Sequence, residues 1–421
     1  MKYDVKICED KSILNEVVLL NAKGTIDGKR TIRYNSSTEI KFLNDDGSAI
    51  TTKEYGYIIA DEIIEKIKYG EEIILNECYV SDLVLDCMNI INLFLGEGAF
   101  FDCTTSFNKT SFFRYAYFDY ATFSEEVDFG RGEFHSKAYF DEAKFLGEAY
   151  FDGAKFRREV CFYMAEFNKE ADFSYAKFSG ETDFSKVRFS RETSFAFATF
   201  SEKTLDLGGV EFNSLCLTNT KNLGQIFLDW KGNNIKEAIY NYAKEHKLYH
   251  HTVAKQFLML KENFNRIGQY DDEDAAYVEY RRCEAKSEFS NENGRDKGFK
   301  RICKRIVYPF RWFVFDYIGS YATAPLRIFR TLCLSILSFG VIYFLGGIYS
   351  SKFEFGNGPI AKCLERFIVA IYFSAITSFT VGYGDISPQS CFIAVVAVIE
   401  SFIGVFLMSY FTVAFARKIL R

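Results

Sequence analysis

The sequence has little proline and little tryptophan. Only 4 of its 421 residues are Pro, none before Pro309, and it has 2 Trp against 46 Phe and 27 Tyr. A chain without proline keeps its backbone N–H groups available for long ladders or helices, as we expect for the first 308 residues. Hydrophobic residues make up 48% and charged residues 25%, which excludes wholesale disorder. The length predicts two or three domains.

Paired cysteine motifs and a cleavable leader are also missing. The 11 cysteines are scattered from Cys8 to Cys391 without a CxxC pair, so zinc sites are not expected. The N-terminal stretch MKYDVKICEDKSIL is polar and has no apolar core of the kind found in signal peptides. We therefore expect most of the thiols to be cytosolic and reduced.

Charge is divided unevenly along the chain. From Arg295 to the end there are 15 Lys and Arg against 6 Asp and Glu, whereas the first 294 residues hold 36 against 50. An acidic front and a basic, apolar back predict a soluble part joined to a membrane part.

Three apolar runs lie in the basic part. Thr331–Ser351 has no charged residue and, at about 1.5 Å per residue, is long enough to cross a bilayer core. Ile386–Ala416 is a second long run, interrupted only by Glu400. The uncharged Phe367–Phe379 between them is too short to span. It is either a buried core helix or, as its position favours, a re-entrant helix covered by protein.

Lys and Arg predict the orientation of the spans. Basic residues crowd the approach to the first run, from Lys300 to Arg330, and follow the last run at Arg417, Lys418 and Arg421. Basic flanks face the cytoplasm, so both termini are expected to be cytoplasmic, with two spans in the plasma (inner) membrane.

The string Thr377–Asp385, TSFTVGYGD, follows the short apolar run and resembles the selectivity filter of bacterial two-span potassium channels. The resemblance covers Leu326–Arg421, about a quarter of the chain. It implies a homotetramer in a lipid membrane. It also implies K+ ions held by filter carbonyls and a threonine hydroxyl, from Thr380, Val381, Gly382, Tyr383 and Gly384.

The residue types suit that chemistry. A potassium ion must shed its water, and a ring of oxygens can replace it. Gly382 and Gly384 lack Cβ and can take the dihedrals that turn successive carbonyls toward one axis. We expect Val381 and Tyr383 to point outward and wedge the filter against the helix behind it, and Asp385 to lie at the outer mouth.

The same resemblance assigns residues of the second span. Gly404 stands where similar channels carry the hinge glycine of the inner helix. A stripe at three- and four-residue steps could line the cavity and gate, or could face lipid; it comprises Val405, Met408, Thr412 and Ala416. Ile376 stands where some relatives carry a pore-helix Glu, so that stabilising pair is absent.

Glu400 is the one ionisable residue in the middle of the second span, and such a residue is costly and usually functional. It could hydrogen-bond behind the filter or at the pore-helix end, or it could be a protonated, locally satisfied acid. Cys363 and Cys391 flank the pore segment on the outer side. Inward rectifiers place a loop disulfide there, but two free thiols are the alternative.

In the front half, Phe recurs between Ala99 and Lys203 in steps that alternate five and six residues, with a small or β-branched residue two positions before each Phe. On a helix, at about 100° per residue, these positions fall all round the axis and form no seam. As extended segments, each small residue and its Phe share one face. The period therefore predicts a solenoid with stacked Phe inside.

This pattern resembles pentapeptide-repeat proteins with an extra residue in every second repeat. The resemblance implies a right-handed quadrilateral β-solenoid, with about 22 residues per coil and about five regular coils, extended by weaker repeats on both sides. Some such solenoids imitate DNA. Here 18 Asp and Glu against 14 Lys and Arg from Ala99 to Lys203 are too mixed in sign, so no nucleic-acid partner is expected.

Helical patterns flank the solenoid. Ala60–Tyr69 reads as a short amphipathic helix that covers the open solenoid edge. Two or three helices are expected within Ile235–Phe289, followed by an aromatic and basic stretch typical of a membrane interface. His246 and His250 have helical spacing but no third metal ligand, which favours an ordinary surface pair.

We therefore expect a mixed multi-domain chain: a β-solenoid, a helical linker and an α-helical two-span pore. The domains are 1–70 (N-terminal region and capping helix), 71–218 (solenoid), 219–294 (helical coupling), 295–325 (interface) and 326–421 (pore). Within the pore the elements are span 1 at 326–350, the pore helix at 365–378, the filter at 380–384 and span 2 at 390–416.

The predicted function is a potassium-selective channel whose solenoid regulates or assembles it, through an unknown cytoplasmic ligand or partner. The alternative is a membrane-anchored scaffold with a non-conducting or weakly selective pore. No nucleophile–base set or phosphate loop is recognisable, so neither an enzyme nor an organic cofactor is expected.

Overall fold

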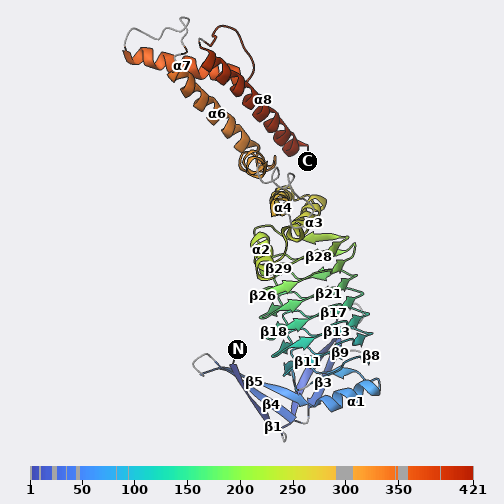
Figure 1. Cartoon of the computed structure of the whole chain (residues 1–421). Helices are drawn as coiled ribbons and strands as arrows, with labels where there is room; N and C mark the ends of the chain where they lie inside the picture. The colour runs from blue at the N-terminus through green and yellow to red at the C-terminus, as the bar shows by residue number, and fades with distance from the viewer. Residues whose placement is uncertain are drawn as a thin grey trace. The chain divides into compact units, whose positions relative to one another are not determined.

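Figure 1 shows the computed structural model, which describes residues 2–8, 11–20, 26–34, 36–43, 48–81, 83–92, 94–290, 307–346, 348, 359–388 and 390–420. The chain divides into two compact units, Met1–Tyr280 and Arg281–Arg421. The division falls inside helix α4 (Tyr270–Ser290), so the predicted helical segment 219–294 contributes residues to both units.

The first unit begins with antiparallel strands. β1 (Lys2–Cys8), β4 (Ser36–Leu43) and β5 (Ala49–Ile58) pair in the order β1-β4-β5, and β2 (Ile13–Leu20) pairs with β3 (Ile26–Tyr34). β5 then pairs in parallel with β7 (Cys78–Ser81), the first strand on one side of the solenoid. Helix α1 (Ala60–Lys68) contacts β6 (Ile73–Ile74) and buries Ile63. The helix predicted to cover the open edge thus shares that task with a strand, which can satisfy edge N–H and C=O groups.

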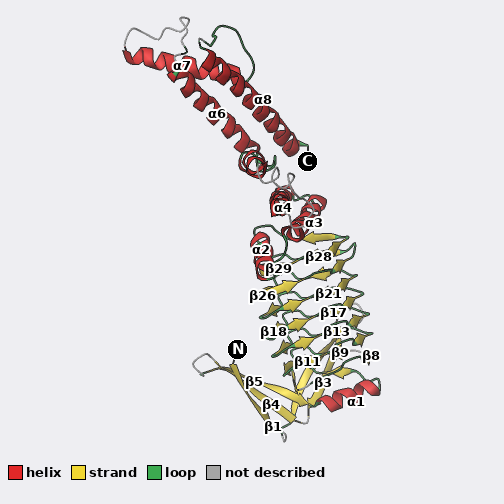
Figure 2. Ribbon diagram, viewed as in Figure 1, coloured by secondary structure: helices red, strands yellow, loops and turns green. Residues whose placement is uncertain are grey.

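The solenoid has four parallel ladders, one for each side of the coil, and about eight turns (Figure 2). The first ladder contains β7, β10 (Phe100–Asp102), β14 (Thr122–Phe123), β18 (Lys144–Phe145), β22 (Glu166–Phe167), β26 (Arg188–Ser194) and β29 (Glu211–Cys216). The second contains β11 (Thr105–Ser106), β15 (Val127–Asp128), β19 (Ala149–Tyr150) and β23 (Ala171–Asp172), and it ends on the long strands β26 and β29.

The third and fourth ladders repeat this arrangement. The third contains β8 (Asn89–Ile90), β12 (Ser111–Phe112), β16 (Glu133–Phe134), β20 (Lys155–Phe156), β24 (Lys177–Phe178), β27 (Thr199–Phe200) and β30 (Lys221–Asn222). The fourth contains β6, β9 (Phe94–Leu95), β13 (Ala116–Tyr117), β17 (Ala138–Tyr139), β21 (Val160–Cys161), β25 (Thr182–Asp183), β28 (Thr204–Asp206) and β31 (Gln225–Phe227).

Stacked phenylalanines form the solenoid core, as predicted. Each Phe lies over the Phe one coil away, with ring centroids 4.4 Å apart for Phe145–Phe167 and 5.2 Å apart for Phe156–Phe178. The small residues beside them, such as Ala149 and Ala154, are fully buried. The weaker flanking repeats extend the stack, because Leu83 and Leu85 before it and Leu205 and Leu207 after it are also buried.

Three helices close the other end of the first unit: α2 (Ile235–Glu245), α3 (His250–Ile267) and the start of α4. α3 buries two amide side chains against the last coil. Gln256 Oε1 accepts the backbone N–H of Leu217 at 2.7 Å. Asn263 accepts the N–H of Ile226 at 2.9 Å and donates to its C=O at 2.8 Å. Side chains of α3 therefore pair with the free edge in place of a further strand.

The second unit is helical. Residues 307–311 are α-helical and continue into a π-helical segment, η1 (Trp312–Tyr317). α6 (Pro325–Leu345), α7 (Pro359–Ser378) and α8 (Cys391–Ile419) follow and pack against one another. α6 and α8 are long and apolar enough to span a membrane.

The bounds of these helices differ from those predicted. α6 begins at Pro325, as expected, but ends at Leu345, before the predicted end at 350; residues 349 and 350 lie outside the described residues. α7 has 20 residues and begins at Pro359, six residues earlier than predicted. Its first turn includes Lys362 and precedes the uncharged run Phe367–Phe379, so an apolar pattern could not assign it to the helix. Residues 295–306 and 351–358, parts of the predicted interface and outer loop, are outside the described residues.

Candidate functional site

The predicted filter starts where α7 ends. After Ser378 the backbone turns: the Val381 N–H donates to Ile376 O at 2.9 Å, and the Thr380 N–H donates to Thr377 O at 3.1 Å. Gly382 and Gly384 have φ of 56° and 76°, in the left-handed region that glycine alone enters without cost. A Cβ on either would meet no atom within 4 Å in the single chain, so backbone conformation, and not space, calls for glycine here.

The single chain adds two details of the filter. Val381 and Tyr383 are 48% and 71% exposed, so within one chain they do not wedge the filter against α7. Thr380 also has a positive φ, 57°, and its hydroxyl donates to Phe379 O at 2.7 Å. No feature of the sequence indicated this left-handed threonine.

Asp385 is held by a residue that the sequence analysis did not identify. The Tyr372 hydroxyl on α7 donates to Asp385 Oδ2 at 3.0 Å and ties the residue after the filter to the helix before it. Ile376, at the place where some relatives carry Glu, is buried. In the sequence, this contact could have been recognised from the aromatic residue that lies thirteen positions before the aspartate.

Glu400 lies at the centre of the pore unit and is fully buried. Its Oε2 accepts the Tyr343 hydroxyl of α6 at 2.5 Å, and its Oε1 accepts the hydroxyls of Ser378 at 2.9 Å and of Ser374. The acid thus hydrogen-bonds at the pore-helix end. Three hydroxyls satisfy the carboxyl group with or without a proton, so the protonated, locally satisfied acid remains the alternative. Glu400 joins α6, α7 and α8 immediately behind the filter, because Ser378 is the last residue of α7.

Gly404 packs against the same helix end. A Cβ at this position would overlap the backbone of Ser378, so α8 approaches α7 closely only because residue 404 is glycine. α8 continues unbroken through Gly404 to Ile419. Close packing is therefore the role that the structure gives this glycine, and its function as a hinge stays a prediction.

The predicted cavity stripe lies on the open face of α8. Val405 and Met408 are 50% and 38% exposed, Thr412 is exposed and Ala416 half-buried. The packed face instead carries Leu407 and Ala414, which contact Ile328 and Leu332 of α6. Within one chain the stripe is free to line a cavity or to face lipid, so both alternatives remain.

Cys363 and Cys391 are free and exposed. The free-thiol alternative therefore holds in this structure, and the disulfide is not formed.

His246 does not group with His250. Its Nε2 lies 2.9 Å from Glu192 Oε2, and with Glu245 these side chains place their possible ligand atoms within 4.8 Å of one another on the surface.

Comparison with protein families supports both the predicted pore domain and the predicted solenoid. Residues 330–421 match the family model described as ion channel, and residues 133–176 and 151–199 match that of pentapeptide repeats. Neither family is enzymatic. No curated protein and no solved structure matched the chain. With the apolar helices α6 and α8, the ion-channel match indicates a membrane protein. The chain thus carries a pentapeptide-repeat β-solenoid domain fused to the pore domain of an ion channel.

Proposed function

We propose that the protein is a homotetrameric potassium-selective channel of the plasma (inner) membrane, with both termini in the cytoplasm. The observation that carries the proposal is the backbone of Gly382 and Gly384, both left-handed within the string TVGYG. Left-handed glycines alternating with ordinary residues let successive carbonyls point to one side of the strand. Carbonyl oxygens and the Thr380 hydroxyl then supply the oxygens that replace the water of a potassium ion.

Four chains are needed because one chain supplies only one wall of a pore. The residues expected to face the pore or a neighbouring subunit are exposed in the single chain: Val381, Tyr383, Val405 and Met408. A ring of four filters would surround a potassium ion on all sides. The Glu400 contacts support this reading, since they fix the end of α7 that aims the filter.

Regulation by the cytoplasmic solenoid is the second part of the proposal. α4 carries Glu279, which accepts the Tyr240 hydroxyl at 2.8 Å within the first unit, and Arg282, which binds Asp316 within the second. One helix thus supplies residues to both units. A ligand of the solenoid would change channel opening only through its differential affinity for closed and open states.

A flux measurement tests the filter. Purified wild-type protein in liposomes should pass K+ in preference to Na+ and be blocked by barium. Gly382→Ala should abolish K+ flux, because an alanine resists the left-handed backbone at the filter, where a shift of a fraction of an ångström removes ion coordination.

A matched control separates pore function from stability. Gly268, which ends α3, has φ of 76° and open space where a Cβ would lie, so Gly268→Ala has the same backbone cost far from the filter in sequence. It should keep wild-type selectivity. Normal K+ flux in the Gly382→Ala channel would refute the assignment of the filter.

The alternative function is a membrane-anchored scaffold with a non-conducting or weakly selective pore. The surface of the pentapeptide-repeat domain, available to a partner protein, is the feature that favours it. Absent or unselective flux from intact wild-type tetramers would support the scaffold and reject the channel.

A further inference from the structure

An unusual turn joins η1 to the first spanning helix. Three consecutive residues, Ser320, Tyr321 and Ala322, have φ of 45°, 55° and 64°. Left-handed backbone is unfavourable for a non-glycine residue, and it occurs mostly at single positions. Such a run persists only where surrounding contacts hold it in place, so its contacts identify what controls it.

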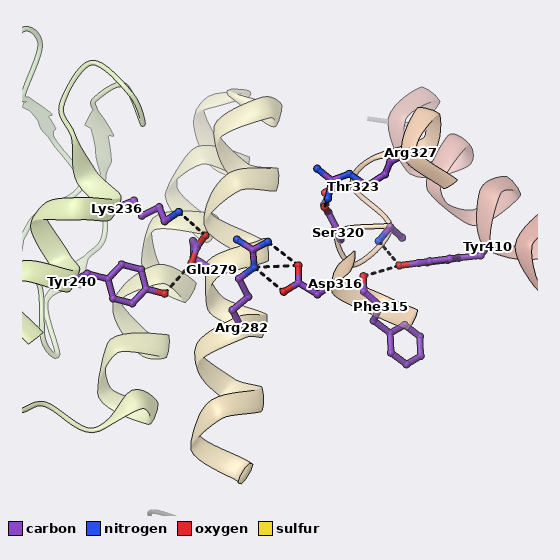
Figure 3. Close-up of polar contacts among 11 residues, drawn as sticks. Lys236, Tyr240, Glu279, Arg282, Phe315, Asp316, Ser320, Thr323, Arg327 and Tyr410 are labelled. Atoms are coloured by element: carbon purple, nitrogen blue, oxygen red, sulfur yellow. Dashed lines mark hydrogen bonds and ion pairs between the residues drawn. The ribbon is translucent and has the colours of Figure 1, made fainter. Parts of the chain in front are cut away.

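The inner helix supplies the main contact. Tyr410 of α8 accepts the Ala322 N–H at 3.0 Å through its hydroxyl oxygen and donates to Phe315 O of η1 at 3.1 Å (Figure 3). Its ring lies on Gly319, where a Cβ would come within 2.5 Å of the ring. A single hydroxyl thus bridges the segments on both sides of Gly319.

The turn is also held from within. Thr323 donates its hydroxyl to Ser320 O at 2.7 Å, and Arg327 of α6 donates to Ser320 Oγ at 2.6 Å. Tyr410 lies two residues beyond Met408 and two before Thr412, at the level of the predicted cavity and gate stripe but on the packed face of α8, with Leu407 and Ala414. A change in this turn therefore acts directly on the part of α8 that would form the gate.

The middle of α4 holds η1 from another side. Arg282 Nε donates to Asp316 Oδ2 at 2.9 Å and its Nη2 donates to Oδ1 at 2.7 Å, a two-point contact with a largely buried carboxylate (Figure 3). The Arg281 guanidinium lies over the Tyr321 ring, 5.7 Å from its centroid. Planar two-point pairs of this kind fix orientation as well as distance.

We propose that Tyr410 is a positioning residue of the gate and that the left-handed turn Ser320–Ala322 is a joint, set by Arg282–Asp316, that passes movement of α4 to α8. The proposal rests on the proposed channel function and adds the residues through which the pore is regulated. The route of this coupling is direct: η1 and the turn after it contact α8, in addition to leading into α6.

The test is single-channel recording of full-length variants in bilayers. Tyr410→Phe keeps the ring on Gly319 but removes both hydrogen bonds, and Gly319→Ala displaces the ring. Each should change the open-to-closed ratio about fivefold or more, in the same direction, since a hydrogen bond contributes about 1 kcal/mol. Tyr317→Phe, which removes an exposed hydroxyl from the same π-helical segment, should leave the ratio unchanged.

A double-mutant cycle tests the link to α4. In an Asp316→Asn background, Tyr410→Phe should change the ratio less than twofold, because the joint is already released. Equal effects of Tyr410→Phe in both backgrounds would overturn the link. If the wild type conducts K+ but Tyr410→Phe leaves the open-to-closed ratio unchanged, the proposed joint is overturned and the channel function is not. A wild type without K+ flux would overturn the proposed function and this inference together.

Discussion

Single residues of the solenoid adopt backbone conformations that their side chains do not favour. Left-handed φ values recur every eleven residues, at Lys109, Tyr120, Arg131, Glu142, Gly153, Met164, Tyr175, Lys186 and Phe197. Only one of these nine is glycine. Backbone hydrogen bonds to the next coil, such as Tyr175 N–H to Ala196 O at 2.8 Å, offset the local cost, so position in the stack outweighs residue preference.

Substitutions at two neighbouring residues test which side chains of the coil point inward and which point outward. Ala154 is fully buried, so Ala154→Arg should unfold residues 1–280 when that unit is produced alone, because the inserted charge has no partner among stacked rings. Lys155 points outward and binds Glu133 at 2.6 Å, so Lys155→Gln should cost about 1 kcal/mol or less. Urea unfolding measures both. Equal losses would show that the assignment of faces is wrong.

A half-buried acid, Asp119, makes solenoid stability depend on pH. Burial, with a smaller contribution from Asp141, raises the pKa of Asp119 to about 7. The folded state therefore holds a proton that the unfolded state releases near pH 4, and stability falls as pH rises between these values. Asp119→Asn should lessen that decline and stabilise the unit at pH 8 by on the order of 2 kcal/mol.

Urea titrations of the 1–280 unit at pH 5 and pH 8 measure this effect. Glu142→Gln, on the exposed surface of the next coil, should leave the pH dependence intact. A wild-type unit as stable at pH 8 as at pH 5 would contradict the assignment of the raised pKa to Asp119.

At the scale of elements, the solenoid depends on its two ends. Parallel coils leave an edge of N–H and C=O groups that would pair with other chains. β5 occupies that edge at one end, and amides of α3 occupy it at the other. Asn263 matters most, because it accepts from and donates to the same buried residue, Ile226.

Asn263→Ala should therefore destabilise the 1–280 unit by about 2–4 kcal/mol, since it leaves two buried backbone groups unpaired. Glu262→Ala, a neighbouring exposed position on α3, should be within about 0.5 kcal/mol of wild type. Thermal unfolding and light scattering together measure the loss and any edge-to-edge aggregation. An Asn263→Ala unit as stable as the control would mean that α3 does not cap the stack.

The sequence predicted well the elements that have a strong local periodicity or a recognisable motif. Phe spacing predicted the solenoid, and the apolar runs with TVGYGD predicted α6, α7, α8 and the filter glycines. What it missed are contacts between elements: Tyr372 with Asp385, Tyr410 with η1, and the amides of α3 with the last coil. These depend on packing between residues far apart in sequence, and a polar residue in a helix does not reveal its partner.

At the scale of the whole molecule, the separation into two compact units predicts which functions can be separated. Selectivity, as proposed, depends on the filter and on Glu400 behind it, all within Arg281–Arg421. Regulation, as proposed, enters through α4. Removal of the first unit should therefore leave selectivity unchanged and alter opening.

The truncation that tests this prediction must end at the boundary between the two units. A deletion ending at residue 230 would leave α2 and α3 with buried faces uncovered, including Phe257 and Leu260, and would invite aggregation. Deletion of 1–280 removes the unit whole and retains Arg282. Bilayer recordings should then give wild-type K+ over Na+ selectivity with a changed open probability. An unchanged open probability would make the solenoid a passive spacer, whereas loss of tetramers on size exclusion would make it an assembly domain.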